Sequence, residues 1–169
     1  MKVRAGLAGI GCIVLLAAAA MASPAASKDE EAIRSLQKRY DAAVKARDLS
    51  AIMSFYVPDE TLLAFDATTP RQYVGAKAYR KNYGDFLAAF PGPLDSEISD
   101  LAVEASGSLA YSRCIDTWHA TDKEGKKTTF VFRVTDVYRK IGGKWLIFHE
   151  HVSFPVDLET GKADLLSRP

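Results

Sequence analysis

The sequence predicts an α+β domain in which helices come first and a long antiparallel sheet follows. Over residues 31–58 and 76–90, apolar residues recur mostly at steps of three and four, as on one face of a helix. From residue 96 onward, strand-like segments alternate with glycine-containing turns. This order favours helices packed on one face of a curled sheet, which leaves a cone with an open mouth where pockets tend to form.

Each element has its own signal. The first helix begins at Glu31 and repeats apolar residues on one face at Ile33, Leu36, Tyr40, Ala43 and Val44. Asp48 is a good N-cap for a short second helix that ends at Pro58. We expect a strand over 60–67, a turn and short return strand over 68–75, and a third helix over 76–90. Four strands are predicted over 96–106, 109–121, 128–140 and 144–154.

Side chains alternate across a strand, so each strand divides into two sets. In the last two strands the more apolar set should face the helices; it contains Phe130, Phe132, Val134, Asp136, Tyr138, Leu146, Phe148, Glu150 and Val152. The opposite set faces outward and includes Trp145, Ile147, His149 and His151.

Hairpin geometry extends this division to a third strand. If residues 123–126 form the connecting loop, Arg113 lies opposite Asp136, and Asp116 lies opposite Arg133. The sequence thus predicts an inner row of Arg113, Asp136 and Glu150. Buried charges need partners, because leaving one unpaired costs on the order of several kcal/mol. The row is interpreted as an internal salt bridge, as the polar end of an apolar pocket, or as both.

The net charge and the first 22 residues limit the class of protein and its location. The net charge is +1, which gives no footprint for nucleic acid. Lys2 and Arg4 precede an apolar run that ends in Ala-Met-Ala at residues 20–22, typical of a cleaved signal peptide; an uncleaved anchor helix is the alternative. We therefore expect a signal over 1–22, a flexible leader over 23–30, one domain over 31–155 and a tail over 156–169. The mature protein would be periplasmic or secreted, without membrane contact, and its remaining cysteine, Cys114, would be buried and inert.

The closing segment "GGKWLIFHEHVSFP" resembles the last strand of the association domain of calcium/calmodulin-dependent protein kinase, which carries Gly-Lys-Trp, His-x-His-x-Ser and a nearby proline. "LLAFDA", "YVGAKAY" and "LAYSR" resemble the same domain in order, from about Glu31 to Pro155. The resemblance implies the nuclear transport factor 2-like superfamily, also called SnoaL-like or cystatin-like: a curved antiparallel sheet around a long helix, often dimeric.

The resemblance also bears on site residues. In the association domain the pocket is rich in basic residues; Arg113 matches one of its arginines and Tyr79 falls where it has a histidine. Two further pocket arginines would fall on Asp136 and Val152, so this chain departs from the anion-binding pattern.

Steroid isomerases share the superfamily, and "KRYDAAVKARDLSAI" resembles their first helix. Tyr40 falls on their oxyanion-binding tyrosine and Asp66 on their catalytic base; their second oxyanion donor falls near Thr135 or Asp136. A carboxylate in an apolar pocket gains basicity, and a phenol stabilises a developing enolate. The alternative is structural: Tyr40 caps the core, and Asp66 pairs with Arg113 or sits in a turn.

Two functions follow. The first is binding of a small, mainly apolar molecule in the cone, with Asp66 and Tyr40 as catalytic residues for isomerase- or hydratase-type chemistry and Tyr79, Arg113, Asp136 and Glu150 as substrate-binding residues. The second is a non-catalytic association module whose outer face, with Trp118, Trp145, His149 and His151, forms a homodimer. Neither function requires a cofactor. We expect no metal site, because the predicted parity separates His119 from His149 and His151.

Overall fold

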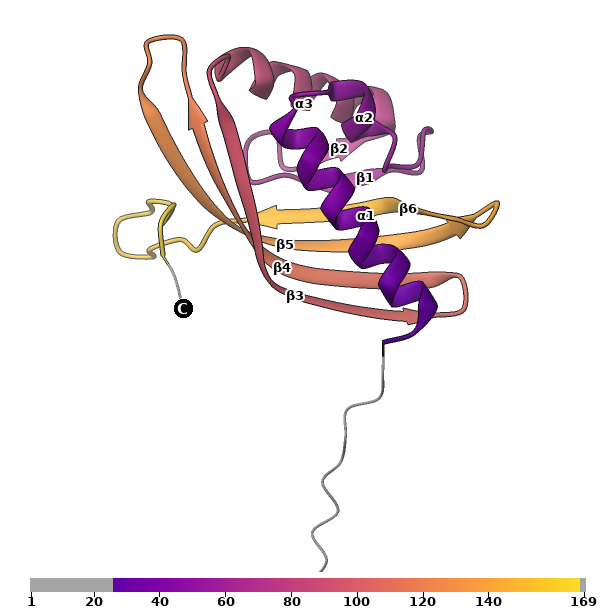
Figure 1. The fold of residues 1–169 in the computed structure, drawn as a ribbon. Coiled ribbons are helices and arrows are strands. Elements are labelled where there is room, and N and C mark those ends of the chain that lie inside the picture. The colour runs from indigo at the N-terminus through magenta and orange to yellow at the C-terminus, as the bar shows by residue number, and fades with distance from the viewer. Residues whose placement is uncertain (1–25, 168–169) are drawn as a thin grey trace, which may run out of the picture.

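The computed structural model describes residues 26–167 and has the predicted α+β architecture (Figure 1). The predicted signal segment lies outside these residues. In chain order the elements are α1 (Lys28–Lys45), α2 (Leu49–Met53), β1 (Leu63–Phe65), β2 (Tyr73–Val74), α3 (Ala76–Ala89), β3 (Leu94–Ser106), β4 (Leu109–Thr121), β5 (Lys127–Ile141) and β6 (Lys144–Ser153). Among residues 26–167, no helix is both long enough and apolar enough to cross a bilayer.

Helix α1 begins slightly earlier than predicted. Ser27 is its N-cap, and the Ser27 and Glu30 side chains each accept a hydrogen bond from the other's backbone N–H. This capping box satisfies two amide groups that a helix start leaves unpaired. The last three residues of the predicted leader are therefore helical. The predicted apolar face of α1 is buried, as expected.

The six strands form one curved sheet in the order β2-β1-β6-β5-β4-β3, and all three helices lie on its concave side (Figure 1). All neighbouring strands are antiparallel except β1 and β6, which run parallel, with Ala64 beside Glu150. The predicted long antiparallel meander is thus β3 to β6. The short β1 and β2 extend the sheet beyond β6 and bring residue 66 close to the inner face.

The β4–β5 register differs by one residue from the prediction. Ser112, not Arg113, lies opposite Asp136, and Asp116 lies opposite Phe132. The cause is an odd-numbered loop of residues 122–126, in which the Asp122 carboxylate accepts hydrogen bonds from the amides of Glu124 and Lys126. A slip of one residue exchanges the two faces of a strand. Arg113 is therefore exposed on the outer face, and Asp116 points inward and is buried.

A bulge in β6 corrects a second assignment. Val137 pairs with His149 but Tyr138 pairs with Ile147, so Phe148 is an extra residue on β6. Before the bulge, Trp145 and Ile147 are buried, contrary to the prediction. Phe148 lies outside, and the Arg139 guanidinium stacks 4.4 Å from its ring centre. After the bulge the side chains point to the faces that were predicted: Glu150 is buried and His151 is exposed.

The tail after β6 packs against the sheet. Val156 forms an isolated bridge with Ala163, and the carbonyl of Leu165 accepts a hydrogen bond from the Val131 amide at 2.8 Å. Val131 is buried, although it belongs to the outward set of β5. The tail therefore covers part of the outer face that the sequence leaves open.

Candidate functional site

A cavity of about 340 Å³ lies between the helices and the concave face of the sheet. Most of its wall is apolar and aromatic, supplied by α3 and by the inner faces of β4, β5 and the end of β6. These side chains are Phe86, Phe90, Trp118, Phe130, Phe132, Val134, Val152 and Phe154. A volume of this size and an apolar wall with a few polar groups are typical of small-molecule sites.

The inner end of the cavity contains Glu150 among buried tyrosines. Tyr56 donates its hydroxyl hydrogen bond to Glu150 Oε2 at 2.6 Å, and Tyr79 donates to Glu150 Oε1. The Tyr40 hydroxyl bonds to the hydroxyl of Tyr83, and its oxygen lies 3.3 Å from the hydroxyl oxygen of Tyr56. The four phenols and the carboxyl thus form one connected network that links α1, α3 and β6, so the proton-carrying groups are held in place.

Asp136 lies directly opposite Glu150 on the neighbouring strand. Gln37 of α1 donates to Asp136 Oδ2 at 2.7 Å and Tyr138 donates at 3.1 Å, whereas Oδ1 has no hydrogen-bond partner among the described residues. Burial raises the pKa of Asp136 to about 6. Burial, and next the neighbouring Asp136, raise the pKa of Glu150 well above its ordinary value. Both carboxyls therefore take up a proton more readily than an exposed carboxyl does.

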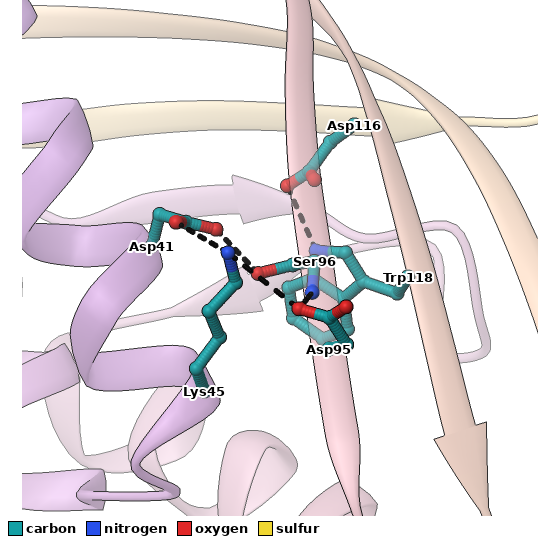
Figure 2. A network of polar contacts seen from close by, with 6 residues as sticks. All are labelled: Asp41, Lys45, Asp95, Ser96, Asp116 and Trp118. Atoms are coloured by element: carbon teal, nitrogen blue, oxygen red, sulfur yellow. Dashed lines mark hydrogen bonds and ion pairs between the residues drawn. The ribbon is translucent and has the colours of Figure 1, made fainter.

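Asp116 is a third buried carboxyl of the cavity. Its Oδ2 accepts the indole hydrogen of Trp118 at 2.8 Å, and its Oδ1 has no partner among the described residues. Figure 2 shows it next to a network of α1 and β3, in which Lys45 is paired with Asp41 and Asp95. Burial raises the pKa of Asp116 to about 7, an effect that the indole hydrogen bond opposes.

Asp66 occupies a different environment, at the edge of the cavity. It is half-buried and accepts hydrogen bonds from Asn82 Nδ2 at 2.9 Å and from the Thr68 amide at 3.0 Å. It also borders a more open hollow on the far side, which Phe65, Arg71 and His151 help to line. A carboxylate in this position meets both the cavity and solvent.

The structure brings most of the predicted site residues together. Tyr40, Asp66, Tyr79, Asp136 and Glu150 all line the cavity. Arg113 does not: the β4–β5 register places it outside, so the predicted inner row contains carboxyls without an arginine. Sequence reasoning missed Asp116, which takes an inward position instead, and Gln37. The Asp122 and Gly125 pair in the loop, typical of a turn held by an aspartate side chain, is the signal that indicates the correct register.

The histidines and tryptophans also take definite places. His149 lies on the outer face, with Nδ1 2.8 Å from the Leu63 carbonyl, and its ring contacts Phe65 edge-on. His119 is exposed on the outer face, contrary to the prediction that it points inward. In residues 26–167 no cluster of three or more His, Cys, Asp or Glu side chains is arranged to hold a metal ion. Trp118 and Trp145 are buried, so they do not belong to the predicted outer interface.

A curled sheet closed by helices over an apolar cavity with buried carboxyls defines a nuclear transport factor 2-like, cystatin-like domain. The chain belongs to the SnoaL-like domain family, whose model matches residues 33–157. The predicted resemblance is thereby confirmed. A search of curated proteins found no match.

Solved structures agree with this assignment. A nuclear transport factor 2-like protein of unknown function from Pseudomonas putida KT2440 is 33% identical, with a TM-score of 0.75 over 83% of this chain and 96% of that one. A protein from Xanthomonas campestris, provisionally named a calcium/calmodulin-dependent protein kinase II association domain, is 26% identical, with a TM-score of 0.65 over 78% and 91%. A protein from Novosphingobium aromaticivorans, provisionally named a scytalone dehydratase, shares the fold at 14% identity, with a TM-score of 0.66 over 83% and 95%.

Proposed function

We propose that this domain binds a small, mainly apolar carbonyl compound in the cavity and moves a proton on it, as an isomerase or a hydratase does. The observation that carries the proposal is the pairing of two kinds of carboxyl in one apolar cavity. Glu150 and Asp136 are buried, and their pKa values are raised by that burial; Asp66 is half-buried and held by hydrogen-bond donors. Carboxyls in contrasting environments are how enzymes obtain an acid and a base at one pH.

The roles follow from these environments. Asp66 is the base that takes a proton from the carbon next to the substrate carbonyl. Glu150, whose pKa burial raises well above its ordinary value, is assigned to donate a hydrogen bond or a proton to the oxygen on which negative charge develops. Tyr79 and Tyr40, which belong to the same hydrogen-bond network, hold this end of the site in position. In this proposal Tyr40 stabilises the oxyanion as one member of the hydrogen-bond network and not as a lone donor.

The test is turnover of β,γ-unsaturated ketones and β-hydroxy ketones, followed by the absorbance of the conjugated enone that both reactions produce. We expect Asp66→Asn and Glu150→Gln each to lower kcat/KM by about 10²- to 10⁴-fold, the usual contribution of a general acid or base. Glu97→Gln, which removes an exposed carboxyl on β3, is the matched control and should leave turnover unchanged. Turnover that survives both cavity substitutions contradicts the assignment.

The provisional dehydratase name of the Novosphingobium structure supports a dehydration substrate as the first to try. It supports no more than that, because the two chains share the fold at 14% identity. The proposal therefore depends on the carboxyls of this chain.

We also propose export and self-association, as the sequence predicts. Export is tested by N-terminal sequencing of the secreted protein, which should begin near Ser23.

Association is tested by sedimentation of the mature protein at micromolar concentration, where a clean monomer contradicts it. The outer face available for association retains Phe148, His149 and His151 but not the two tryptophans.

A further inference from the structure

One end of the cavity combines a buried carboxyl with aromatic rings. On β4, Asp116 lies opposite Phe132, and Trp118 follows two residues later on the same face. The Trp118 and Phe132 rings meet edge-on with centres 5.6 Å apart. Asp116 is 6% exposed, and its Oδ1 has no partner among the described residues. The protein thus leaves one strong acceptor of this wall unused.

The charged groups around Asp116 do not neutralise the charge of its carboxylate. Among the described residues that line the cavity, none is Lys, Arg or His. The titratable groups that face Asp116 are Cys114 of β4, Asp41 and Lys45 of α1, and Asp136 of β5. Lys45 is already paired with Asp41 at 3.0 Å and Asp95 at 3.5 Å, as Figure 2 shows. A negative, aromatic-walled site without a resident cation favours a positively charged ligand group, because carboxylates and ring faces both attract cations.

We propose that this end of the cavity binds the ammonium group of an organic amine, with Asp116 as its ionic partner and the rings of Trp118 and Phe132 beside it. The inference rests on the proposed function, since it takes the cavity as the ligand site, and it adds the chemical class of the ligand. Ser112, which pairs with Asp136, is four residues from Asp116 along β4, or about 13 Å by strand geometry. A ligand whose amine is held at Asp116 must therefore span about 13 Å to reach the end of the cavity at Asp136 and Glu150.

Three probes of one shape test this class: 2-(1-naphthyl)ethylamine, 2-(1-naphthyl)ethanol and 1-naphthylacetate, titrated calorimetrically into the mature protein. We expect the amine to bind at least about tenfold more tightly than the alcohol at pH 8, the typical difference for one charge-assisted hydrogen bond. The carboxylate should bind most weakly, because it meets the carboxyls of the cavity.

Proton release on binding tests the proposal with the wild-type protein alone. Burial raises the pKa of Asp116 to about 7, and an ammonium beside it stabilises the ionised form. At pH 6 the amine should therefore release protons on binding, measured by titration in buffers of different ionisation enthalpy. The alcohol should release none, and the preference for the amine should grow between pH 6 and pH 8.

Asp116→Asn should lower the amine affinity by about tenfold and leave the alcohol affinity within about threefold, because only the ionic contact is lost. Glu97→Gln, an exposed carboxyl on the neighbouring β3, should change neither affinity. An alcohol that binds as tightly as the amine, or a carboxylate that binds more tightly, overturns the amine proposal and leaves the proposed function standing. If none of the three probes binds, both proposals fail.

Discussion

Replacing Glu150 with alanine should destabilise the domain by roughly 3–5 kcal/mol, whereas replacing it with glutamine should cost about 1 kcal/mol or less. Alanine removes the acceptor of two buried phenols, those of Tyr56 and Tyr79. It also leaves space at the inner end of the cavity. Glutamine keeps an oxygen acceptor, and its amide can donate to a tyrosine oxygen, so the network stays satisfied.

Urea unfolding at pH 7 measures this difference. The reason for the loss is checked by combining Glu150→Ala with Tyr79→Phe, which removes one of the stranded hydroxyls. The double variant should recover about 1–2 kcal/mol relative to Glu150→Ala alone, because an unsatisfied buried donor is costly. Equal stabilities of the alanine and glutamine variants would show that the network does not hold this end of the cavity together.

The second large effect concerns pH. Burial raises the pKa of Asp116 to about 7 in the folded protein, from an ordinary value of 3.8. The folded state therefore binds this proton more tightly than the unfolded state, so its contribution to stability is present below pH 3.8 and is lost as the pH rises toward 7. Asp116→Asn removes that dependence. Relative to the wild type, the variant should gain about 3 kcal/mol of unfolding free energy between pH 4.5 and pH 8.

The comparison uses urea unfolding of both proteins across this pH range. Hydrogen bonds lower the pKa values of Asp29, Asp59, Asp157 and Asp164. These groups act in the opposite direction in both proteins and cancel in the difference. Glu97→Gln should give a curve parallel to the wild type. Parallel curves for Asp116→Asn as well would mean that Asp116 is ionised as easily in the folded protein as in the unfolded one.

The element order and the buried faces of the helices could be predicted from the sequence, because helical spacing and turn residues are local signals. The apolar face of α1 and the Asp48 cap of α2 both appear as expected. The parallel pairing of β1 with β6 could not be predicted, because a three-residue strand carries no signal for its partner. The family resemblance, by contrast, depended on one specific motif at the end of the chain and was sufficient for the fold.

The candidate site was predicted in part for a related reason. Glu150 and Asp136 were placed correctly, since both lie on segments where simple alternation holds. Arg113 and Asp116 lie on the faces opposite to those predicted. The loop between β4 and β5 has five residues and not the predicted four, and a shift of one residue swaps the two faces of β4. Trp145 moved inside because the bulge at Phe148 reverses parity within β6. The register correction has a chemical consequence: it replaces an arginine by a third carboxyl in the cavity. The ligand that the sequence predicts as small and mainly apolar is therefore proposed to carry a cationic group.

The central claim is that the cavity between α3 and the sheet is where a small molecule binds. A crystal structure of residues 23–169 grown with 2-(1-naphthyl)ethanol tests it most directly, because this neutral probe does not depend on the preference for amines. We predict the naphthyl ring among Trp118, Phe130 and Phe132, with the hydroxyl within hydrogen-bond distance of one of the buried carboxyls. A cavity that contains only ordered water, with the probe in the open hollow beside Arg71 and His151, would contradict the claim.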